Sequence, residues 1–385
     1  MTVMKFGGAA LRDADGFRRM VEILSDTDHA VVVVSALSTT TRDLETCALT
    51  AKNTDVKGAL GLLESVLSRH RNLAQEALDG SEERTAVLEI LGRSARDLER
   101  LLHGIAVTRQ LTPRTLDRVL SFGEHLALTI AVHALSARGL DAVALNAGEL
   151  IVTTDAFGSA TPIESKSRVL AERVLSPLLD QHRFVVVQGF VGATERGEPT
   201  TMGKESSNLT ATFVASLIAA ERVVIWTDVD GIRSIDPKIE SETELRPFLT
   251  YEQAKHAAHH GLKLLYKTMI EPAERSGIPI TIAATHSSGG ETTVISSAQT
   301  DVRPIVTLVE TDVPGMWAVH VLFTDTLEWL SALHSAVAGI NDSLRLHVLA
   351  DPAASVVTIT LSEEDAYSLA RQLHATLTST SKRSA

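Results

Sequence analysis

The 385-residue chain contains a single cysteine, Cys47. One cysteine cannot form an intramolecular disulfide and cannot build a cysteine-based zinc site, so both kinds of scaffold are excluded. We therefore expect a protein of a reducing compartment. No sequence context marks Cys47 as a nucleophile, which favours a packed, structural thiol.

Long apolar runs and an excess of positive charge are also missing. No stretch approaches the roughly 18 uninterrupted apolar residues of a membrane span, and residues 1–8 lack a basic region followed by an apolar one. Lys and Arg total 36 against 48 Asp and Glu, a formal charge of −12. Because nucleic-acid binding depends on clustered basic residues, this charge disfavours it. We expect a cytoplasmic protein with neither a nucleic-acid nor a membrane partner, although a local basic site could still hold a small anion.

Short β-branched runs alternate with longer helical stretches, which is typical of an α/β fold with a mainly parallel sheet. Several runs are apolar at consecutive positions, as in central strands covered by helices on both faces. Helices are predicted over 208–220 and over 114–138, the latter broken near Ser121 and Gly123. The predicted strands span residues 3–6, 30–36, 142–146, 184–188, 223–227 and 278–282.

The pattern also predicts a division into domains. Residues 1–298 form the predicted α/β domain, and 54–110 form a helical insertion within it, because their apolar residues recur at helical spacing. Residues 302–378 predict a small α+β unit of order β-α-β-β-α. Residues 379–385 predict a frayed polar tail. The strands of the small unit are expected at 305–310, 344–349 and 355–361, and its helices at 326–337 and 363–378.

Glycines, a lysine and hydroxyl-bearing residues directly follow the first two predicted strands. Lys5 precedes Gly7 and Gly8, whose amides can approach an anion closely while the ammonium lies over phosphate oxygens. Ser35 and Thr41 lie in the hydroxyl-rich run after the second strand. Ligands of open parallel sheets bind at this carboxyl edge. A tight turn with a solvated lysine and an ordinary helix cap remain the alternatives.

Three later segments have two interpretations each. Glu124, among apolar helical residues, is either a surface residue, which composition favours, or a buried group aimed at a cation. The run from Gly203 to Asn208 opens a helix with small, hydroxyl and cationic residues, and it predicts an anion site rather than a simple cap. The aspartates of 228–236 with Lys238 could position a nucleotide and its metal, or could form turns.

Taken in order, these segments resemble the aspartate kinases of the amino-acid kinase family over residues 1–298. The order of the segments is more specific than any one of them. The matching text is Lys5-Phe6-Gly7-Gly8; Val33-Val34-Ser35-Ala36 with Thr41; Ser121-Phe122-Gly123-Glu124; Thr154-Asp155; Gly189-Phe190-Val191-Gly192; Gly203-Lys204 with Ser207-Asn208; Ile225-Trp226-Thr227-Asp228-Val229-Asp230-Gly231; Asp236-Pro237-Lys238; and Gly261 with Lys263.

The resemblance implies the amino-acid kinase fold and transfer of the γ-phosphoryl group of ATP to the side-chain carboxylate of L-aspartate. Mg²⁺ would bridge the ATP phosphates with few protein ligands, and no side chain is predicted to bind a metal. The implied catalytic residues are Lys5, which binds the transferring phosphate and offsets its developing charge, and Asn208, at the position whose side chain orients the catalytic lysines. The implied substrate contacts are Ser35, Thr41, Glu124, Lys204 and Ser207. The implied ATP contacts are Lys5, Gly7, Gly8, Gly203, Thr227, Asp228, Arg233, Lys238 and Lys263.

The chain departs from the family pattern at several of these positions. Lys204 replaces an arginine that grips the substrate α-carboxylate as a fork, and a lysine offers only a point charge. Asn208 replaces an aspartate and carries no charge, and Arg233 replaces a tyrosine near the adenine. Three functions follow as hypotheses: an aspartate kinase, a same-fold kinase of another amino-acid carboxylate, and a non-catalytic protein that binds nucleotide or amino acid.

The carboxyl-terminal part resembles an ACT domain, a module that binds amino-acid effectors at dimer interfaces. The segment 313–316, Val-Pro-Gly-Met, matches the turn after the first strand of such modules. Many aspartate kinases carry two modules, whereas residues 302–378 have room for one. The resemblance implies an amino-acid effector and a homodimer, because pairing with a second copy would cover the open sheet edge.

Overall fold

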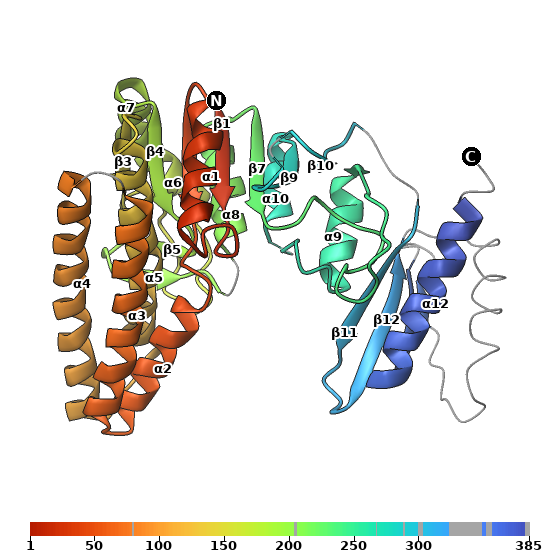
Figure 1. Ribbon diagram of the computed structural model, residues 1–385, viewed down its shortest axis with the longest axis horizontal. Coiled ribbons are helices and arrows are strands. Elements are labelled where there is room, and N and C mark those ends of the chain that lie inside the picture. Colours follow the sequence, from red (N-terminus) through yellow and green to blue (C-terminus); the bar gives the residue numbers. More distant parts are fainter. Residues whose placement is uncertain are drawn as a thin grey trace. The chain divides into compact units, whose positions relative to one another are not determined.

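The structure is a computed structural model of the 385-residue chain (Figure 1). It describes residues 1–78, 81–203, 206–266, 268–287, 289–298, 303–322, 349–351 and 356–381. The chain forms two compact units: unit 1 comprises Met1–Asp228 and Ile278–Gly289, and unit 2 comprises Val229–Gly277 and Gly290–Ala385. The predicted helix at 326–337 and the strand residues 344–348 lie outside the described residues.

Unit 1 is built on parallel strands in the order β3-β4-β2-β1-β7-β9. The strands β1, β2 and β4 are buried at every position, as expected for the centre of a sheet covered on both faces. The predicted α/β class and parallel sheet are therefore confirmed. The strands are β1 (Thr2–Phe6), β2 (Ala30–Val34), β3 (Ala142–Leu145), β4 (Phe184–Gln188), β7 (Arg222–Thr227) and β9 (Ile280–Ala284).

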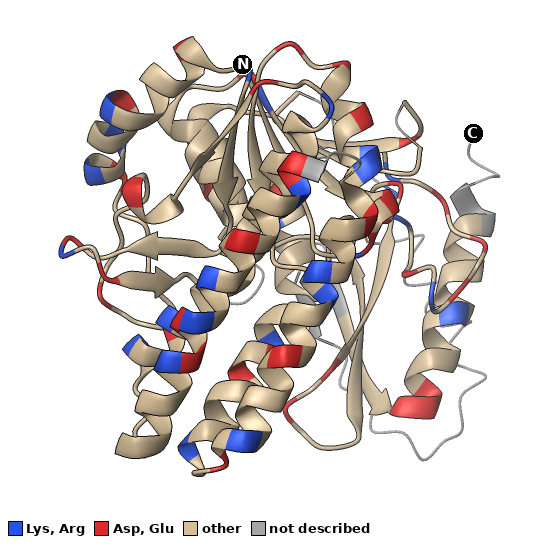
Figure 2. Cartoon of the chain, turned by 60° about the vertical axis from the view of Figure 1, so that its left-hand side comes forward, with Lys and Arg blue, Asp and Glu red and all other residues tan. Residues whose placement is uncertain are grey.

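Helices and one hairpin complete unit 1. The long helices α2, α3, α4 and α5 pack side by side, with α3 and α4 lying within the segment predicted as a helical insertion (Figure 1). Acidic and basic residues both occur along these long helices (Figure 2). The helices are α1 (Ala14–Ser25), α2 (Thr40–Lys52), α3 (Val56–Ala77), α4 (Ser81–Thr108), α5 (Pro113–Ser136), α6 (Glu164–Leu170), α7 (Ser176–Gln181) and α8 (Ser207–Leu217), with a 3-10 helix η1 (Ala147–Glu149) and a π-helical segment η2 (Ala171–Leu175). The hairpin pairs β5 (Val191–Ala193) with β6 (Pro199–Thr201).

The helix α5 is continuous, so the predicted break near Ser121 and Gly123 is wrong. Gly123 serves close packing instead, because a Cβ atom at this position would lie 3.1 Å from the side chain of Ala36. Ser121 Oγ donates to the carbonyl of Arg118 at 2.9 Å and so stays within the helix. Among the described helices, α5 alone is long and apolar enough to cross a membrane, but 67% of its apolar window is buried. It is a core helix of unit 1.

Unit 2 contains a four-stranded antiparallel sheet of order β11-β12-β14-β13, with helix α12 packed against it. The strand β12 (Met316–Leu322) was not predicted. It forms because Gly315, with φ of 75°, turns the chain back so that Leu322 pairs with Ile305. The helix α12 runs through Ser381, past the expected end at 378. The other elements of unit 2 are β8 (Phe248–Leu249), α9 (Tyr251–His259), α10 (Ile270–Ser276), β10 (Thr292–Ile295), β11 (Ile305–Glu310), β13 (Leu349–Asp351), β14 (Val356–Ser362) and α12 (Glu363–Ser381).

Candidate active site

The carboxyl ends of four parallel strands of unit 1 meet along one edge of the sheet. The segments that follow these strands are the ones that the sequence singled out, and backbone hydrogen bonds tie each to its neighbour. Because ligands of open parallel sheets bind at this edge, the segments mark one candidate site. The bonds run from Gly7 N to Trp226 O at 3.1 Å, from Ser35 N to Phe6 O at 3.2 Å and from Gly189 N to Val34 O at 2.8 Å.

Lys5 lies on the central strand β1, between β2 and β7, and only 9% of the residue is exposed. Its ammonium lies beside Gly7, since a Cβ atom at Gly7 would lie 3.1 Å from Lys5 Nζ. A Cβ atom at Gly8 would lie 2.5 Å from the carbonyl oxygen of Ala36. Both glycines therefore serve close approach: Gly7 leaves room for the ammonium, and Gly8 lets the loops after β1 and β2 touch.

The amino-terminal end of α8 borders the same edge. Ser207 packs so closely on Gly189 that a Cβ atom there would lie 2.5 Å from Ser207 Cβ. Within the described chain, the capping residue Ser206 makes no side-chain cap bond, and the buried Ser206 Oγ and Asn208 Oδ1 have no hydrogen-bond partner. A helix start attracts anions through its free N–H groups and dipole. Buried polar atoms without a protein partner leave hydrogen-bonding capacity for a bound ligand or an ordered water.

Glu124 is buried, so the interpretation as a surface residue is wrong. Its Oε1 accepts a hydrogen bond from Ala36 N at 3.2 Å, whereas its buried Oε2 has no partner among the residues described. Burial raises the pKa of Glu124 to about 8, because desolvation outweighs the backbone hydrogen bonds. Thr41 lies alongside, with Oγ1 at 3.6 Å from a Cβ atom placed on Gly123. A cationic ligand atom at Oε2 would restore the charged carboxylate.

Asp117 is a second buried carboxylate that the sequence analysis missed. Its Oδ2 accepts from Gly158 N and Thr201 N, each at 2.8 Å, and its Oδ1 accepts from Thr201 Oγ1 at 2.7 Å. It thereby ties α5 to the loop at 158 and to β6, which ends two residues before Gly203. A signal existed in the sequence: Asp117 precedes Glu124 by seven positions and so shares its helix face.

Replacing Asp117 by alanine is expected to lower the free energy of unfolding by about 3 kcal/mol, because two backbone N–H groups lose their acceptor. Asp117→Asn keeps one acceptor oxygen and should lose less. Equilibrium unfolding in urea measures both changes. The control is Asp97→Ala, since Asp97 makes only an exposed pair with Arg100 among the described contacts and should change stability by less than about 1 kcal/mol. Equal stability of Asp117→Ala and the wild type would contradict the bridging role.

The remaining predicted ATP contacts fall into both units. Thr227 and Asp228 end β7 in unit 1, where Thr227 Oγ1 donates to Asp228 Oδ1 at 3.2 Å. In unit 2, Arg233 pairs with Glu291 at 3.0 Å. Asp236 interacts with both other predicted ATP contacts of unit 2, Lys238 and Lys263. Its Oδ1 accepts a hydrogen bond from Lys238 N at 2.9 Å, and its Oδ2 lies 3.7 Å from Lys263 Nζ. Lys204 lies outside the described residues.

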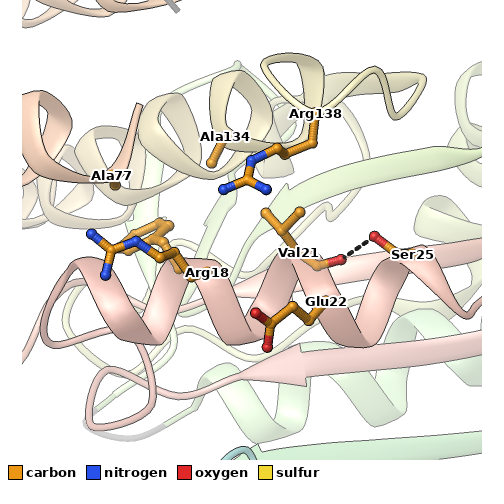
Figure 3. A pocket seen from close by; sticks show the side chains of 8 residues that line it. Arg18, Val21, Glu22, Ser25, Ala77, Ala134 and Arg138 are labelled. Atoms are coloured by element: carbon orange, nitrogen blue, oxygen red, sulfur yellow. Dashed lines mark hydrogen bonds between the residues drawn. The ribbon is translucent and has the colours of Figure 1, made fainter. Parts of the chain in front are cut away.

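A separate pocket of about 230 Å³ lies in unit 1 (Figure 3). Two of its polar side chains already bond within the fold: Arg18 Nη2 donates to the carbonyl of Glu76 at 3.2 Å, and Ser25 Oγ donates to that of Val21 at 2.8 Å. The lining includes none of the predicted site residues that the structure describes. It consists of Phe17, Arg18, Val21, Glu22, Ser25, Ala77, Ala134 and Arg138.

Cys47 is buried in α2, and the pKa of its thiol is raised to about 11. Desolvation is the main cause, and the negative charge of Asp43 adds to it. The thiol stays protonated near neutral pH and is a poor nucleophile. The prediction of a packed, structural cysteine is confirmed.

Comparison with known proteins agrees with this geometry. The model of the amino acid kinase family matches residues 1–284, so the chain belongs to that family. The chain is 28% identical over 314 residues to chloroplastic aspartokinase 1 of Arabidopsis thaliana, covering 80% of this chain and 54% of that protein. It is 30% identical over 290 residues to lysine-sensitive aspartokinase 3 of Escherichia coli K12, covering 74% and 61%. The chain thus spans little more than half the length of these relatives.

Solved structures support the fold. Escherichia coli aspartokinase III in complex with aspartate and ADP superposes with a TM-score of 0.86 at 21% identity, over 98% of this chain and 100% of that one. The fold predicted from the sequence, an amino-acid kinase fold with a small carboxyl-terminal α+β region, is therefore confirmed.

Proposed function

We propose that this chain is an aspartate kinase that transfers the γ-phosphoryl group of ATP to the β-carboxylate of L-aspartate, giving 4-phospho-L-aspartate and ADP. One observation carries the proposal. The ammonium of Lys5 on β1 and the start of α8 lie at one edge of the sheet of unit 1, and the buried carboxylate of Glu124 on α5 meets the loop after β2 there through Ala36 N. The names of the relatives, and the aspartate and ADP bound to Escherichia coli aspartokinase III, support the choice of substrates.

In this proposal, cationic and N–H groups stabilise the charge of the transferring phosphoryl group. A carboxylate oxygen of aspartate attacks the γ-phosphorus, the bond to the β,γ-bridging oxygen breaks, and ADP leaves with that electron pair. Because the attacking carboxylate is already ionised, no general base is needed. Lys5, the amide of Gly8 and the start of α8 hold the phosphate oxygens, whereas Gly7, whose own amide bonds to the carbonyl of Trp226, leaves room for the ammonium. Such positioning and charge stabilisation supply most of the catalysis in phosphoryl transfer.

The amino acid is held by its charged ends. Glu124 Oε2, buried and without a partner in the described part of the chain, takes the substrate ammonium. Ser35 and Thr41 line the same pocket, Lys204 binds the α-carboxylate, and Ser207 contacts the substrate. Asn208 Oδ1 accepts a hydrogen bond from the ammonium of a catalytic lysine and so helps to orient that lysine.

The proposed ATP contacts belong to both units of the chain. The contacts are Gly203, Thr227 and Asp228 with those of unit 2, Arg233, Lys238 and Lys263. Mg²⁺ offsets phosphate charge when bound. The described residues contain no group of three His, Cys, Asp or Glu that could hold a metal.

The homodimer, the amino-acid effector and the cytoplasmic location belong to the same proposal. Within the described residues, the four-stranded sheet has edge strands β11 and β13, and Val306 N of β11 already donates to the carbonyl of Ser234 at 2.7 Å, so the proposal places the second copy at the β13 edge. Such pairing would satisfy its open backbone groups.

A second candidate is a kinase of the same fold that acts on another amino-acid carboxylate. Lys204 and Asn208 favour it, because both replace residues of the aspartate kinase pattern. The test measures ADP release with Mg²⁺ and ATP across L-aspartate, L-glutamate and close analogues, with hydroxylamine added to trap the acyl phosphate. Hydroxamate formed only with aspartate supports the first candidate, and hydroxamate formed only with another substrate supports the second. ATP binding without any product would overturn both in favour of a regulatory protein.

Asn208→Asp is expected to raise kcat about tenfold. The reason is that a carboxylate holds the ammonium of a catalytic lysine more strongly than an amide oxygen does. Steady-state kinetics with the preferred substrate measures the change. Asn53→Asp, at an exposed position after α2, is the control for an added charge. A fall in kcat would show that the site is adapted to the neutral side chain.

A further inference from the structure

In unit 2, each predicted ATP contact lies within two residues of a residue that is anchored to the four-stranded sheet or to α12. Arg233 precedes Ser234, Lys238 precedes Ile239, and Lys263 follows Gly261. Because a side chain can be no better placed than the backbone that carries it, these anchors decide how well the three cations are held.

Ser234 is the first anchor. It is 1% exposed, and its hydroxyl accepts a hydrogen bond from Glu244 N at 2.9 Å. The hydroxyl proton is then available to Nε2 of His374 on α12, at 2.8 Å. Burial lowers the pKa of His374 and so favours the neutral ring that can accept this bond. The carbonyl of Ser234 also accepts from Val306 N of β11 at 2.7 Å.

The residues beside Lys238 form the second anchor. Ile235 is 1% exposed and belongs to the same apolar core as β11, β12, β14 and α12, and Ile239 packs against this core. Arg371 on α12 donates from Nε to the carbonyl of Ile239 at 2.9 Å. The turn that carries Lys238 is therefore held by the apolar packing of Ile235 and Ile239 and by the hydrogen bond from the Arg371 guanidinium.

Gly261 is the third anchor. Its φ of 84° suits glycine, and a Cβ atom there would lie 2.0 Å from Val309 Cγ2 of β11. The preceding carbonyl, that of His260, accepts from Thr307 Oγ1 at 2.6 Å. The backbone before Lys263 thus lies directly on the edge strand β11, and no larger side chain fits at residue 261.

We infer that Arg371 and His374 are positioning residues for ATP, because through Ile239 and Ser234 they hold the backbone that carries Lys238 and Arg233. This inference rests on the proposed function, since it uses the ATP contacts assigned there. It gives α12 a role in nucleotide affinity that requires no effector.

The experiment measures Mg-ATP binding to the full chain by titration calorimetry, together with KM for ATP, KM for the amino acid and kcat. Arg371→Ala removes an exposed side chain, so the fold should survive. It is expected to raise Kd and KM for ATP about threefold to tenfold, with kcat and KM for the amino acid unchanged. The matched control is Gln372→Ala, at the next exposed position of α12, and it should bind ATP like the wild type.

A second pair of variants tests His374. His374→Phe leaves the Ser234 hydroxyl without its acceptor and should weaken ATP binding, whereas His374→Gln can accept again and should restore much of it. Unchanged ATP affinity in both Arg371→Ala and His374→Phe would overturn the inference and leave the proposed function standing. Equal losses in ATP affinity, amino-acid KM and kcat would also overturn it, since they indicate general loosening. A wild-type chain that binds no Mg-ATP would overturn the proposed function and the inference with it.

Discussion

Replacing Lys5 by alanine is expected to lower kcat about a thousandfold, because the transferring phosphoryl group loses its buried ammonium. Lys5 is 9% exposed on the central strand β1, so its charge acts where water screens it little. Phosphoryl transfer relies on positioning and charge stabilisation rather than on a covalent enzyme intermediate. Loss of the Lys5 ammonium therefore removes a main part of the catalysis. Single-turnover measurements with saturating Mg-ATP would isolate the chemical step.

Two controls accompany this prediction. Lys5→Met keeps the aliphatic packing of the side chain and should be as inactive as alanine, which separates loss of charge from loss of packing. Lys52→Ala removes an exposed ammonium in the last turn of α2 and should leave kcat unchanged. The melting temperature should show that both Lys5 variants fold. Wild-type turnover in Lys5→Ala would contradict the assignment of Lys5 to the transferring phosphoryl group.

Replacing Glu124 by glutamine is expected to raise KM for the amino acid about a hundredfold, because the substrate ammonium loses a buried charged partner. The side chain keeps its shape and can still accept from Ala36 N, which is 3.2 Å from Oε1. The fold should therefore be retained. Steady-state kinetics at several amino-acid concentrations would show the effect in KM rather than in the affinity for ATP. An unchanged KM would contradict the assignment of Glu124 to the ammonium.

The raised pKa of Glu124, about 8 against the usual 4.5, adds a pH signature. The folded state holds this proton more tightly than the unfolded state, so the stability that it contributes is present below pH 4.5 and is lost as pH rises towards 8. Glu124→Gln does not titrate. Its melting temperature should therefore rise relative to that of the wild type across this window, and a constant difference would contradict the buried neutral carboxyl.

Ligand binding should reverse that protonation. An ammonium placed at Oε2 favours the carboxylate, so amino-acid binding near pH 7 should release up to about one proton from the wild type. Calorimetric titrations in two buffers with different ionisation enthalpies measure the proton count. Glu124→Gln should release fewer protons, and an equal release from both proteins would place the titrating group elsewhere.

The sequence predicted the features that depend on neighbouring residues. Apolar β-branched runs gave the central strands, because a strand buried on both faces needs apolar side chains at every position. The glycines after Lys5 marked a close approach, and the structure shows what is approached: the lysine ammonium for Gly7 and the carbonyl of Ala36 for Gly8. The roles of these residues in catalysis remain proposals.

Features that depend on distant residues could not be predicted in this way. The hairpin strand β12 was missed although six of its seven residues, Met316–Leu322, are apolar, because a short apolar run fits a strand and a buried helix segment equally well. Its pairing with both β11 and β14 decides the matter. The bridge made by Asp117 was missed for a similar reason. Its partner Thr201 lies 84 residues away along the chain.

For this protein, then, the sequence by itself determined the α/β class, the order of the phosphate and nucleotide segments and the likeness to aspartate kinases, because each is written in local composition and spacing. The tertiary structure decided whether the acidic side chains of α5 face solvent or the site. Glu124 meets Ala36 across 88 residues of sequence, and only that packing removes water from its carboxyl group. The burial of a polar side chain depends on residues that are distant in the sequence and pack around it, so a local pattern cannot predict it.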